Sequence, residues 1–148
     1  MSGHMLLLVH AFATLFMTGL IWFVQVVHYP LMAMVGEANY AAFQAAHQRR
    51  TTLVVGPAML VEATSAALLL VPGFAGVSPS LSWAGAGLLA VAWVSTFAVQ
   101  VPLHAKLERG FDAAVHRRLV ATNWVRTAAW SLRAGVALAM IWAAFARA

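Results

Sequence analysis

The chain has 148 residues, of which 63% are hydrophobic and 9% are charged. Soluble domains carry about 25% charged residues, so this composition excludes a soluble enzyme and a disordered chain and indicates an integral membrane protein. Cysteine is absent, which excludes disulfide frameworks, thiolate metal sites and thiol nucleophiles. The net charge of +5 is expected to mark cytoplasmic loops, and no nucleic-acid partner is predicted.

Apolar stretches of the length that crosses a bilayer, about 20 residues each, recur along the chain. Residues 1–5 are interpreted as a cloning scar, and residues 6–148 as a single transmembrane domain. The predicted spans are residues 6–28, 51–71, 81–103 and 119–145. Gly56-Pro57 predicts a kink in the second span, which neighbouring helices would tolerate. The sequence therefore predicts an all-α fold, an integral membrane four-helix bundle surrounded by lipid.

Basic residues are concentrated in two of the predicted connections. Segments 36–50 and 106–118 contain six of the nine Lys and Arg residues, namely Arg49, Arg50, Lys106, Arg109, Arg117 and Arg118. The turn at 72–80 contains none, and Arg147 follows the last span. Because cytoplasmic loops carry an excess of Lys and Arg, we expect both termini outside. The expected location is the cytoplasmic membrane of a bacterium.

The two halves of the chain share a short pattern. The sequence AAHQRR at 45–50 resembles AAVHRR at 113–118, and the preceding span in each half ends in Pro-Leu, at 30–31 and at 102–103. This pattern predicts two helical hairpins related by a parallel pseudo-repeat.

Three histidines come from different segments and fall near the same membrane face. His28 ends the first span, His47 precedes the second and His104 ends the third. Imidazole is a good ligand for iron, copper and zinc, so these residues are the predicted ligands of a transition metal. The alternative is that each is an interfacial anchor, because the sequence contains no dense metal-binding motif.

Polar side chains continue deeper into the spans. When depth is counted from the cytoplasmic ends of the spans at about 1.5 Å per residue, Glu62 and Arg133 both lie roughly 18–22 Å into the membrane. At this common depth they are predicted to form a pair. Ionisable groups within a bilayer usually face the bundle interior, so this pair is assigned a catalytic role or a role in fixing helix register. Closer to the histidines lie two predicted substrate-orienting residues and two predicted catalytic residues: Gln25 and Gln100, and Asn123 and Arg126.

Helical spacing places several of these residues on common faces. On the third span the face contains Trp93, Thr96, Gln100 and His104, and on the fourth Asn123, Arg126, Trp130 and Arg133. Three tryptophans, Trp22, Trp93 and Trp130, are predicted to line a pocket for a flat aromatic substrate. Every span therefore contributes polar groups to one predicted pocket in the cytoplasmic half.

The second half of the chain contains QVPLH at 100–104 and LVATNWVRT at 119–127, followed by Trp130 and Arg133. With these motifs it resembles the anthrone-oxygenase-like family of small four-span membrane proteins. His104 stands where the family usually has Asn. The resemblance implies oxidation of activated anthrones, substrates that supply their own electrons, so a cofactor-free mechanism is among the expectations.

A weaker resemblance is to HemJ-type and CopD-like membrane proteins, carried by His10, Trp22, Pro30 and the segment at 50–59. It implies haem b, with His10 or an inner histidine as an axial ligand.

The favoured hypothesis is a membrane oxidoreductase, specifically an oxygenase, whose small apolar or aromatic substrate enters from the bilayer. Arg126 and Asn123 would stabilise an anionic oxygen. The alternatives are the haem protein and a small transporter gated by Glu62 and Arg133. A homo-oligomer is also considered, because small residues on the third span form a face for close helix contact: Gly85, Ala86, Gly87 and Ala90.

Overall fold

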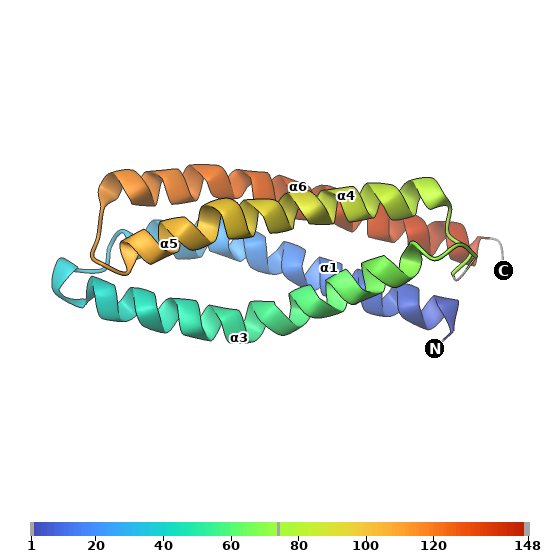
Figure 1. Ribbon diagram of the computed structural model, residues 1–148, viewed down its shortest axis with the longest axis horizontal. Coiled ribbons are helices and arrows are strands. Elements are labelled where there is room, and N and C mark those ends of the chain that lie inside the picture. Colours follow the sequence, from blue (N-terminus) through green and yellow to red (C-terminus); the bar gives the residue numbers. More distant parts are fainter. Residues whose placement is uncertain (1, 74, 147–148) are drawn as a thin grey trace.

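The computed structural model describes residues 2–73 and 75–146 and shows four long rods joined by short connections (Figure 1). The first rod consists of α1 (Gly3–Phe23), η1 (Val24–His28) and α2 (Tyr29–Met32), and the second is α3 (Glu37–Leu69). The third consists of α4 (Pro79–Ser95), η2 (Thr96–Gln100) and α5 (Val101–Leu107), and the fourth is α6 (Ala113–Phe145). Each rod is long and apolar enough to cross a membrane. The all-α four-helix bundle is confirmed.

The rods are longer than the predicted spans at the end of the bundle where α3 and α6 begin. The second and fourth were predicted to begin at 51 and 119, whereas α3 begins at Glu37 and α6 at Ala113. The added residues are rich in Ala, Gln and Arg, which are strong helix formers although they lower the hydropathy. At the other end, the first helical turn includes Met5, whose N–H donates to Ser2 Oγ at 3.3 Å. Helix α3 continues through Pro57, and its axis bends near the middle (Figure 1).

Asp112 caps the start of α6 outside the spans. Its Oδ1 accepts from the N–H groups of Ala114 at 2.7 Å and Val115 at 3.0 Å. The backbone hydrogen bonds from Val115 and Ala114 hold the pKa of the Asp112 carboxyl below its ordinary value. A lowered pKa means that this stabilisation is present above the unfolded pKa, about 3.9, and is lost as the pH falls through the folded value.

We therefore expect the hydrogen-exchange protection factors of the Ala114 and Val115 amides to fall when the pH drops below about 4. The variant Asp112→Asn keeps a capping oxygen but cannot titrate, so its protection factors are expected to stay constant over this range. NMR hydrogen exchange measures both. An unchanged pH dependence in the Asn variant would contradict the assignment.

Helix α6 is the centre of the bundle. It packs along both α1 and α4, while α3 packs mainly on α1 and makes fewer contacts with α4 and α5. The side between α3 and the third rod is therefore the least closely packed. One core cluster lies mid-bundle, where Met17 and Ile21 of α1 contact Met59 of α3 and Trp130 of α6.

Gly85 allows the close approach of α4 to α6. A Cβ at this position would lie 3.3 Å from Met140 Cε and 3.6 Å from Arg133 Nη1. Its carbonyl also accepts a hydrogen bond from Arg133 Nη1. The prediction that Gly85 belongs to an oligomer face is therefore wrong, because the residue faces the interior of the bundle; Gly87 and Ala90 on the same helix are exposed.

Substituting Gly85→Leu is expected to lower the free energy of unfolding by about 1–3 kcal/mol, because the added side chain has no space between the helices. The matched control is Gly87→Leu, since a Cβ at Gly87 meets nothing within 4 Å. Unfolding in denaturing detergent, followed by circular dichroism, measures both. Equal losses in the two variants would contradict this description of the helix contact.

Two π-helical segments occur at matching places in the two halves. Segment η1 ends before Tyr29-Pro30 and η2 before Val101-Pro102. The N–H of Tyr29 donates to the Val24 carbonyl and that of Val101 to the Thr96 carbonyl, each five residues back. Proline lacks the N–H that would continue the α-helical pattern, and π-bulges accommodate such interruptions and often occur at functional sites. The paired bulges agree with the predicted parallel relation between hairpins.

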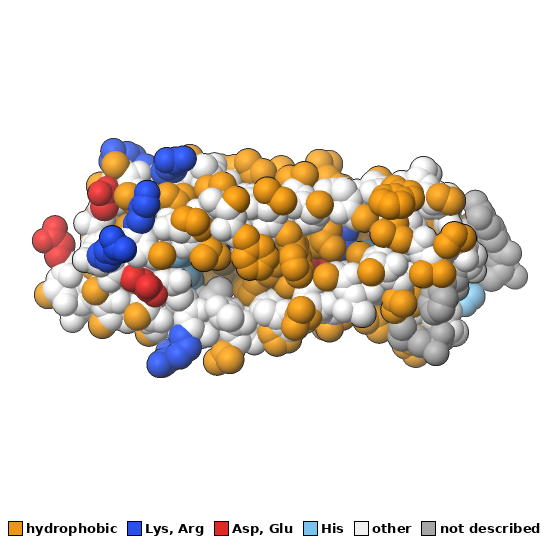
Figure 2. Space-filling view, viewed as in Figure 1, with side chains coloured by type: hydrophobic (Ala, Val, Ile, Leu, Met, Phe, Trp, Pro, Cys, Tyr) orange, Lys and Arg blue, Asp and Glu red, His pale blue; other side chains and the backbone are white. Residues whose placement is uncertain are grey.

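Charge is distributed unevenly along the bundle. The six basic residues of segments 36–50 and 106–118 are exposed at the end where α3 and α6 begin, and Figure 2 shows Lys and Arg side chains gathered at that end. We call it the basic end. Two further arginines, Arg126 and Arg133, are buried inside the bundle. Arg147 lies outside the described residues.

Candidate functional site

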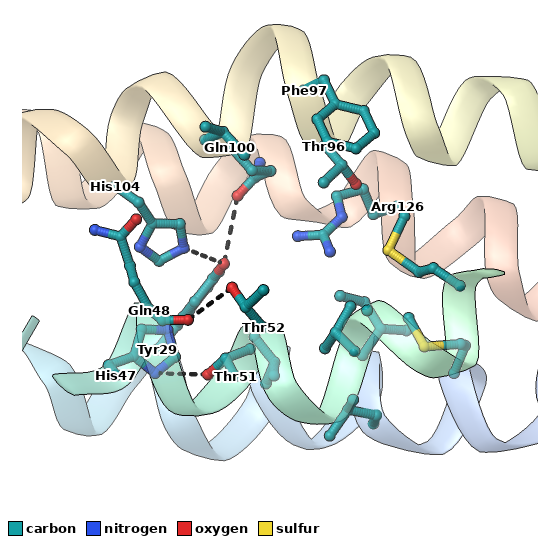
Figure 3. A pocket seen from close by; sticks show the side chains of 18 residues that line it. Tyr29, His47, Gln48, Thr51, Thr52, Thr96, Phe97, Gln100, His104 and Arg126 are labelled. Carbon is teal, nitrogen blue, oxygen red and sulfur yellow. Dashed lines mark hydrogen bonds between the residues drawn. The ribbon is translucent and has the colours of Figure 1, made fainter. Parts of the chain in front are cut away.

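A cavity of about 240 Å³ opens between α3 and the η2–α5 part of the third rod. Figure 3 shows its polar end, toward the basic end of the bundle, and its apolar continuation toward the centre. The apolar lining includes Met17, Leu20, Ile21, Val24, Val55, Met59 and Phe97. The polar lining includes Tyr29, His47, Gln48, Thr51, Gln100, His104 and Arg126.

His104 is held by a chain of hydrogen bonds that crosses the cavity. Gln44 Nε2 lies 2.6 Å from His104 Nδ1, and His104 Nε2 lies 3.1 Å from the Tyr29 hydroxyl. The Tyr29 hydroxyl donates in turn to Gln100 Oε1 at 3.4 Å. With the Gln44 amide as donor to Nδ1, the network assigns the His104 proton to Nε2. The chain thus fixes both the ring orientation and the tautomer.

His47 forms a second pair with His28. Their rings are stacked with centroids 4.4 Å apart, and His28 Nε2 lies 2.9 Å from His47 Nδ1. The Thr51 hydroxyl is also 3.1 Å from His47 Nδ1. In the tautomer that carries the proton on Nδ1, this proton is shared between the His28 nitrogen and the Thr51 hydroxyl, and Nε2 of His47, a residue that lines the cavity, has a free lone pair. Such a nitrogen can act as a base.

Arg126 reaches the cavity from α6 and is only 8% exposed. Its Nη1 donates to Asn123 Oδ1 at 3.0 Å, and Asn123 Nδ2 donates to Gln25 Oε1 at 2.8 Å. Its guanidinium carbon lies 5.2 Å from the centre of the Trp130 ring. Its Nε is buried without a hydrogen-bond partner. The predicted residues Gln25 and Asn123 therefore position the arginine and do not line the cavity.

The charge of Arg126 has no counter-ion in the described part of the chain, where the ion pair is Arg133 with Glu62. A buried unpaired charge is costly, and hydrogen bonds to neutral groups only partly offset that cost. An anionic group bound in the cavity would offset it further. The guanidinium is therefore the feature of the cavity that most directly indicates the chemistry of a ligand.

Glu62 and Arg133 form a separate network that does not line the cavity. Glu62 Oε1 accepts from Arg133 Nε at 2.8 Å and Oε2 accepts from Trp130 Nε1 at 3.0 Å. Arg133 also donates to the Gly85 carbonyl, and its Nη2 lies 3.4 Å from His10 Nε2. One network thus joins α1, α3, α4 and α6. The predicted pairing is confirmed, and its position favours the structural role over the catalytic one.

The tryptophans predicted to line the pocket lie elsewhere. Trp22 faces outward, donating to Ser131 Oγ at 2.9 Å and meeting Trp124 edge-on. Trp93 packs against the mid-bundle core, and Trp130 is fully buried beneath Arg126. The aromatic residues of the cavity are Tyr29 and Phe97 instead.

Sequence reasoning brought together His47, His104, Gln100 and Arg126, but it missed two important residues. Tyr29 was given no role in the predicted pocket, although it lies next to the proline that follows η1. Gln44 belongs to a segment that was predicted to be a connection. The structure places this segment in α3, where Gln44 lies three residues before His47. Spacing of three on a helix was the signal that would have found it.

The three histidines that were predicted to bind a metal are arranged for hydrogen bonding to protein groups. Both ring nitrogens of His104 face protein partners, and His28 and His47 face each other. In residues 2–73 and 75–146 no group of three or more His, Asp or Glu side chains has an arrangement that would hold a metal ion. Metal ligation by His28, His47 and His104 stays a prediction.

His10 also fits a structural role better than that of a haem ligand. It is 2% exposed, its Nδ1 lies 2.8 Å from Ser65 Oγ and its Nε2 faces Arg133. Neither nitrogen is directed to open space. The haem hypothesis therefore lacks a free axial nitrogen at this residue.

Comparisons with protein-family models, with curated proteins and with solved structures found no match. The functional argument therefore depends on the geometry of the cavity.

Proposed function

We propose that the chain is an integral membrane oxidoreductase, an oxygenase that acts on an apolar aromatic substrate with an acidic C–H group. The observation that carries this proposal is the unpaired Arg126 guanidinium in a largely apolar cavity, close to His47 and His104. A cationic donor in an apolar site stabilises an anion that forms there far more strongly than it would in water.

The reaction begins with proton removal. His47 Nε2 takes a proton from the acidic carbon, and the electron pair of that C–H bond is delocalised through the conjugated rings onto the carbonyl oxygen of the substrate, where Arg126 stabilises the enolate. Tyr29, hydrogen-bonded to His104 Nε2 and Gln100, orients the ring system. Burial of the cavity excludes competing water from the anion.

The oxidant is dioxygen and the electrons come from the substrate. The enolate carbon reacts with O₂ to form a C–O bond, and the His47 proton returns to the distal oxygen to give a hydroperoxide. His47 then takes the second proton from the same carbon, the electron pair of that C–H bond forms the C=O bond, and the O–O bond breaks. The departing hydroxide takes the proton from His47 and leaves as water, so that R₂CH₂ + O₂ becomes R₂C=O + H₂O. One C–O double bond replaces two C–H bonds, and all four electrons taken up by O₂ derive from the substrate. The proposed mechanism uses no resident cofactor.

The proposed orientation follows from the positive-inside tendency. The protein lies in the cytoplasmic membrane of a bacterium. Its exposed basic end faces the cytoplasm, and both termini lie on the opposite side of the membrane. The polar end of the cavity then lies in the cytoplasmic half of the bundle.

The experiment is oxygen uptake by vesicles that contain the purified protein, with anthrone as the probe substrate. We expect uptake above that of protein-free vesicles, and we expect His47→Gln to lower the rate by about 10²–10⁴-fold, the usual contribution of a general base. The matched control is His4→Gln. His4 is exposed near the start of α1, at the end of the bundle opposite to the basic end (Figure 1). Equal rates for the two variants would overturn the role of His47.

A further inference from the structure

On the side of the basic end, hydrogen bonds connect α3 to α5 and to Glu108, the residue that follows α5. Gln44 bonds to His104, and Gln48 Nε2 donates to Glu108 Oε1 at 2.5 Å. The stacked His28 and His47 rings lie beside these bridges. A ligand that arrived from the aqueous phase at this end would have to break several of these contacts.

The cavity is open on the lateral face of the bundle. Its outer lining there consists of Thr52 and Gly56 on α3 and of Phe97 and Val101 on η2 and α5. We call these four residues the lateral opening. Thr52, Phe97 and Val101 are exposed, and Figure 2 shows the hollow between the lower and upper rods on this face. This is also the side where α3 makes few contacts with the third rod.

The lateral opening lies at the depth of the lipid chains. Gly56 precedes Leu69, the last residue of α3, by 13 residues, which corresponds to about 20 Å along a helix axis. The hydrocarbon core of a bilayer is about 30 Å thick. The apolar end of α3 therefore places the lateral opening within the leaflet nearer the basic end, where its exposed Phe97 and Val101 contact lipid.

Gly56 leaves space at this opening because it has no side chain. It lines the cavity, and a Cβ at this position would meet nothing within 4 Å. A larger side chain would therefore project into unoccupied space at the opening without colliding with the bundle.

We propose that the ligand enters laterally from the leaflet at the basic end, between Gly56 and Phe97, and that the absence of a side chain at Gly56 sets the largest ligand that passes. The ligand class is a lipid-dissolved, flat aromatic molecule that carries one ionisable oxygen; the last element rests on the proposed function. The apolar body reaches the cavity through lipid, and the oxygen reaches Arg126 at the inner end.

The first test uses the natural absence of cysteine in the chain. Thr52→Cys and Phe97→Cys, each carrying a nitroxide label, are reconstituted in phosphatidylcholine vesicles and studied by power-saturation spectroscopy. Oxygen, which concentrates in lipid, is expected to relax both labels strongly, and a water-soluble nickel chelate only weakly. The reverse result, with the nickel chelate dominant at both positions, would overturn the lateral route.

The second test is Gly56→Trp, with Gly87→Trp as the matched control because Gly87 is exposed and also has nothing within 4 Å. The probe is 9-anthracenecarboxylate added to vesicles and excited outside the tryptophan absorption band, and the readout is the rate of the change in the probe's own fluorescence that Arg126→Met abolishes. We expect at least a tenfold slower rate for Gly56→Trp and an unchanged rate for Gly87→Trp. Equal rates would overturn the proposal.

These results are separable from those on oxygenation. Slow binding in Gly56→Trp without any oxygen uptake in the natural chain would support the lateral route and reject the proposed reaction. Oxygen uptake that is unaffected by Gly56→Trp would support the reaction and reject the lateral route. Circular dichroism of the labelled and Trp variants confirms that each remains folded.

Discussion

Replacing Glu62 with Leu is expected to lower the free energy of unfolding by about 3–5 kcal/mol, the range observed when one partner of a buried ion pair is removed. Glu62 is 0% exposed and Arg133 is 1% exposed, so the guanidinium would keep its charge without the carboxylate that now accepts from it. Trp130 Nε1 would also lose its acceptor. Unfolding in denaturing detergent, followed by circular dichroism, measures the loss.

The control for this prediction is the double variant Glu62→Leu with Arg133→Met. Replacing both members of a buried pair with apolar residues is often neutral or stabilising, so the double variant is expected to recover most of the lost stability. A single Glu62→Leu variant as stable as the natural chain would contradict the structural role assigned to the network.

Replacing Arg126 with Met is expected to weaken ligand binding without lowering the free energy of unfolding. Stability should be unchanged or slightly higher, because an unpaired buried charge is removed. Binding of 9-anthracenecarboxylate, an aromatic anion that serves as a probe, should weaken by about 30-fold or more, equivalent to the 2 kcal/mol or more usually lost with a buried charged contact. Fluorescence titration in vesicles measures this affinity.

Neutral anthracene is the matched ligand control. It has the same ring system without the carboxylate, so its affinity should be nearly equal for the natural chain and Arg126→Met. If the Met variant bound the carboxylate as tightly as the natural chain does, Arg126 would not be the anion-binding group. A large loss of stability would show instead that the arginine has a structural role like that of Arg133.

The fold could be predicted because its cause is composition. Four long apolar stretches in a chain with little charge lead to a helical membrane bundle, since backbone groups in lipid must be satisfied within each helix. Helix bounds could not be predicted as well. Residues 37–50 have low hydropathy, so they were not included in the predicted span. They are helical because Ala, Gln and Arg have high helix propensity.

The site could be predicted only in part. Helical spacing correctly grouped Gln100 with His104, and equal depth correctly paired Glu62 with Arg133. It failed for Trp22, because a lipid-exposed helix is apolar on both faces and the sequence does not reveal which face turns inward. No role was predicted for Tyr29, which directly follows a π-helical segment where the regular helical periodicity changes.

The most direct test of the central claim is anthrone oxidation under ¹⁸O₂ in ordinary water, analysed at early times by mass spectrometry. The proposed reaction predicts one ¹⁸O atom in each new carbonyl group, one O₂ consumed for each product molecule, and a rate above that of both protein-free vesicles and Arg126→Met. Product that lacked ¹⁸O, or a rate equal to that of protein-free vesicles, would contradict it.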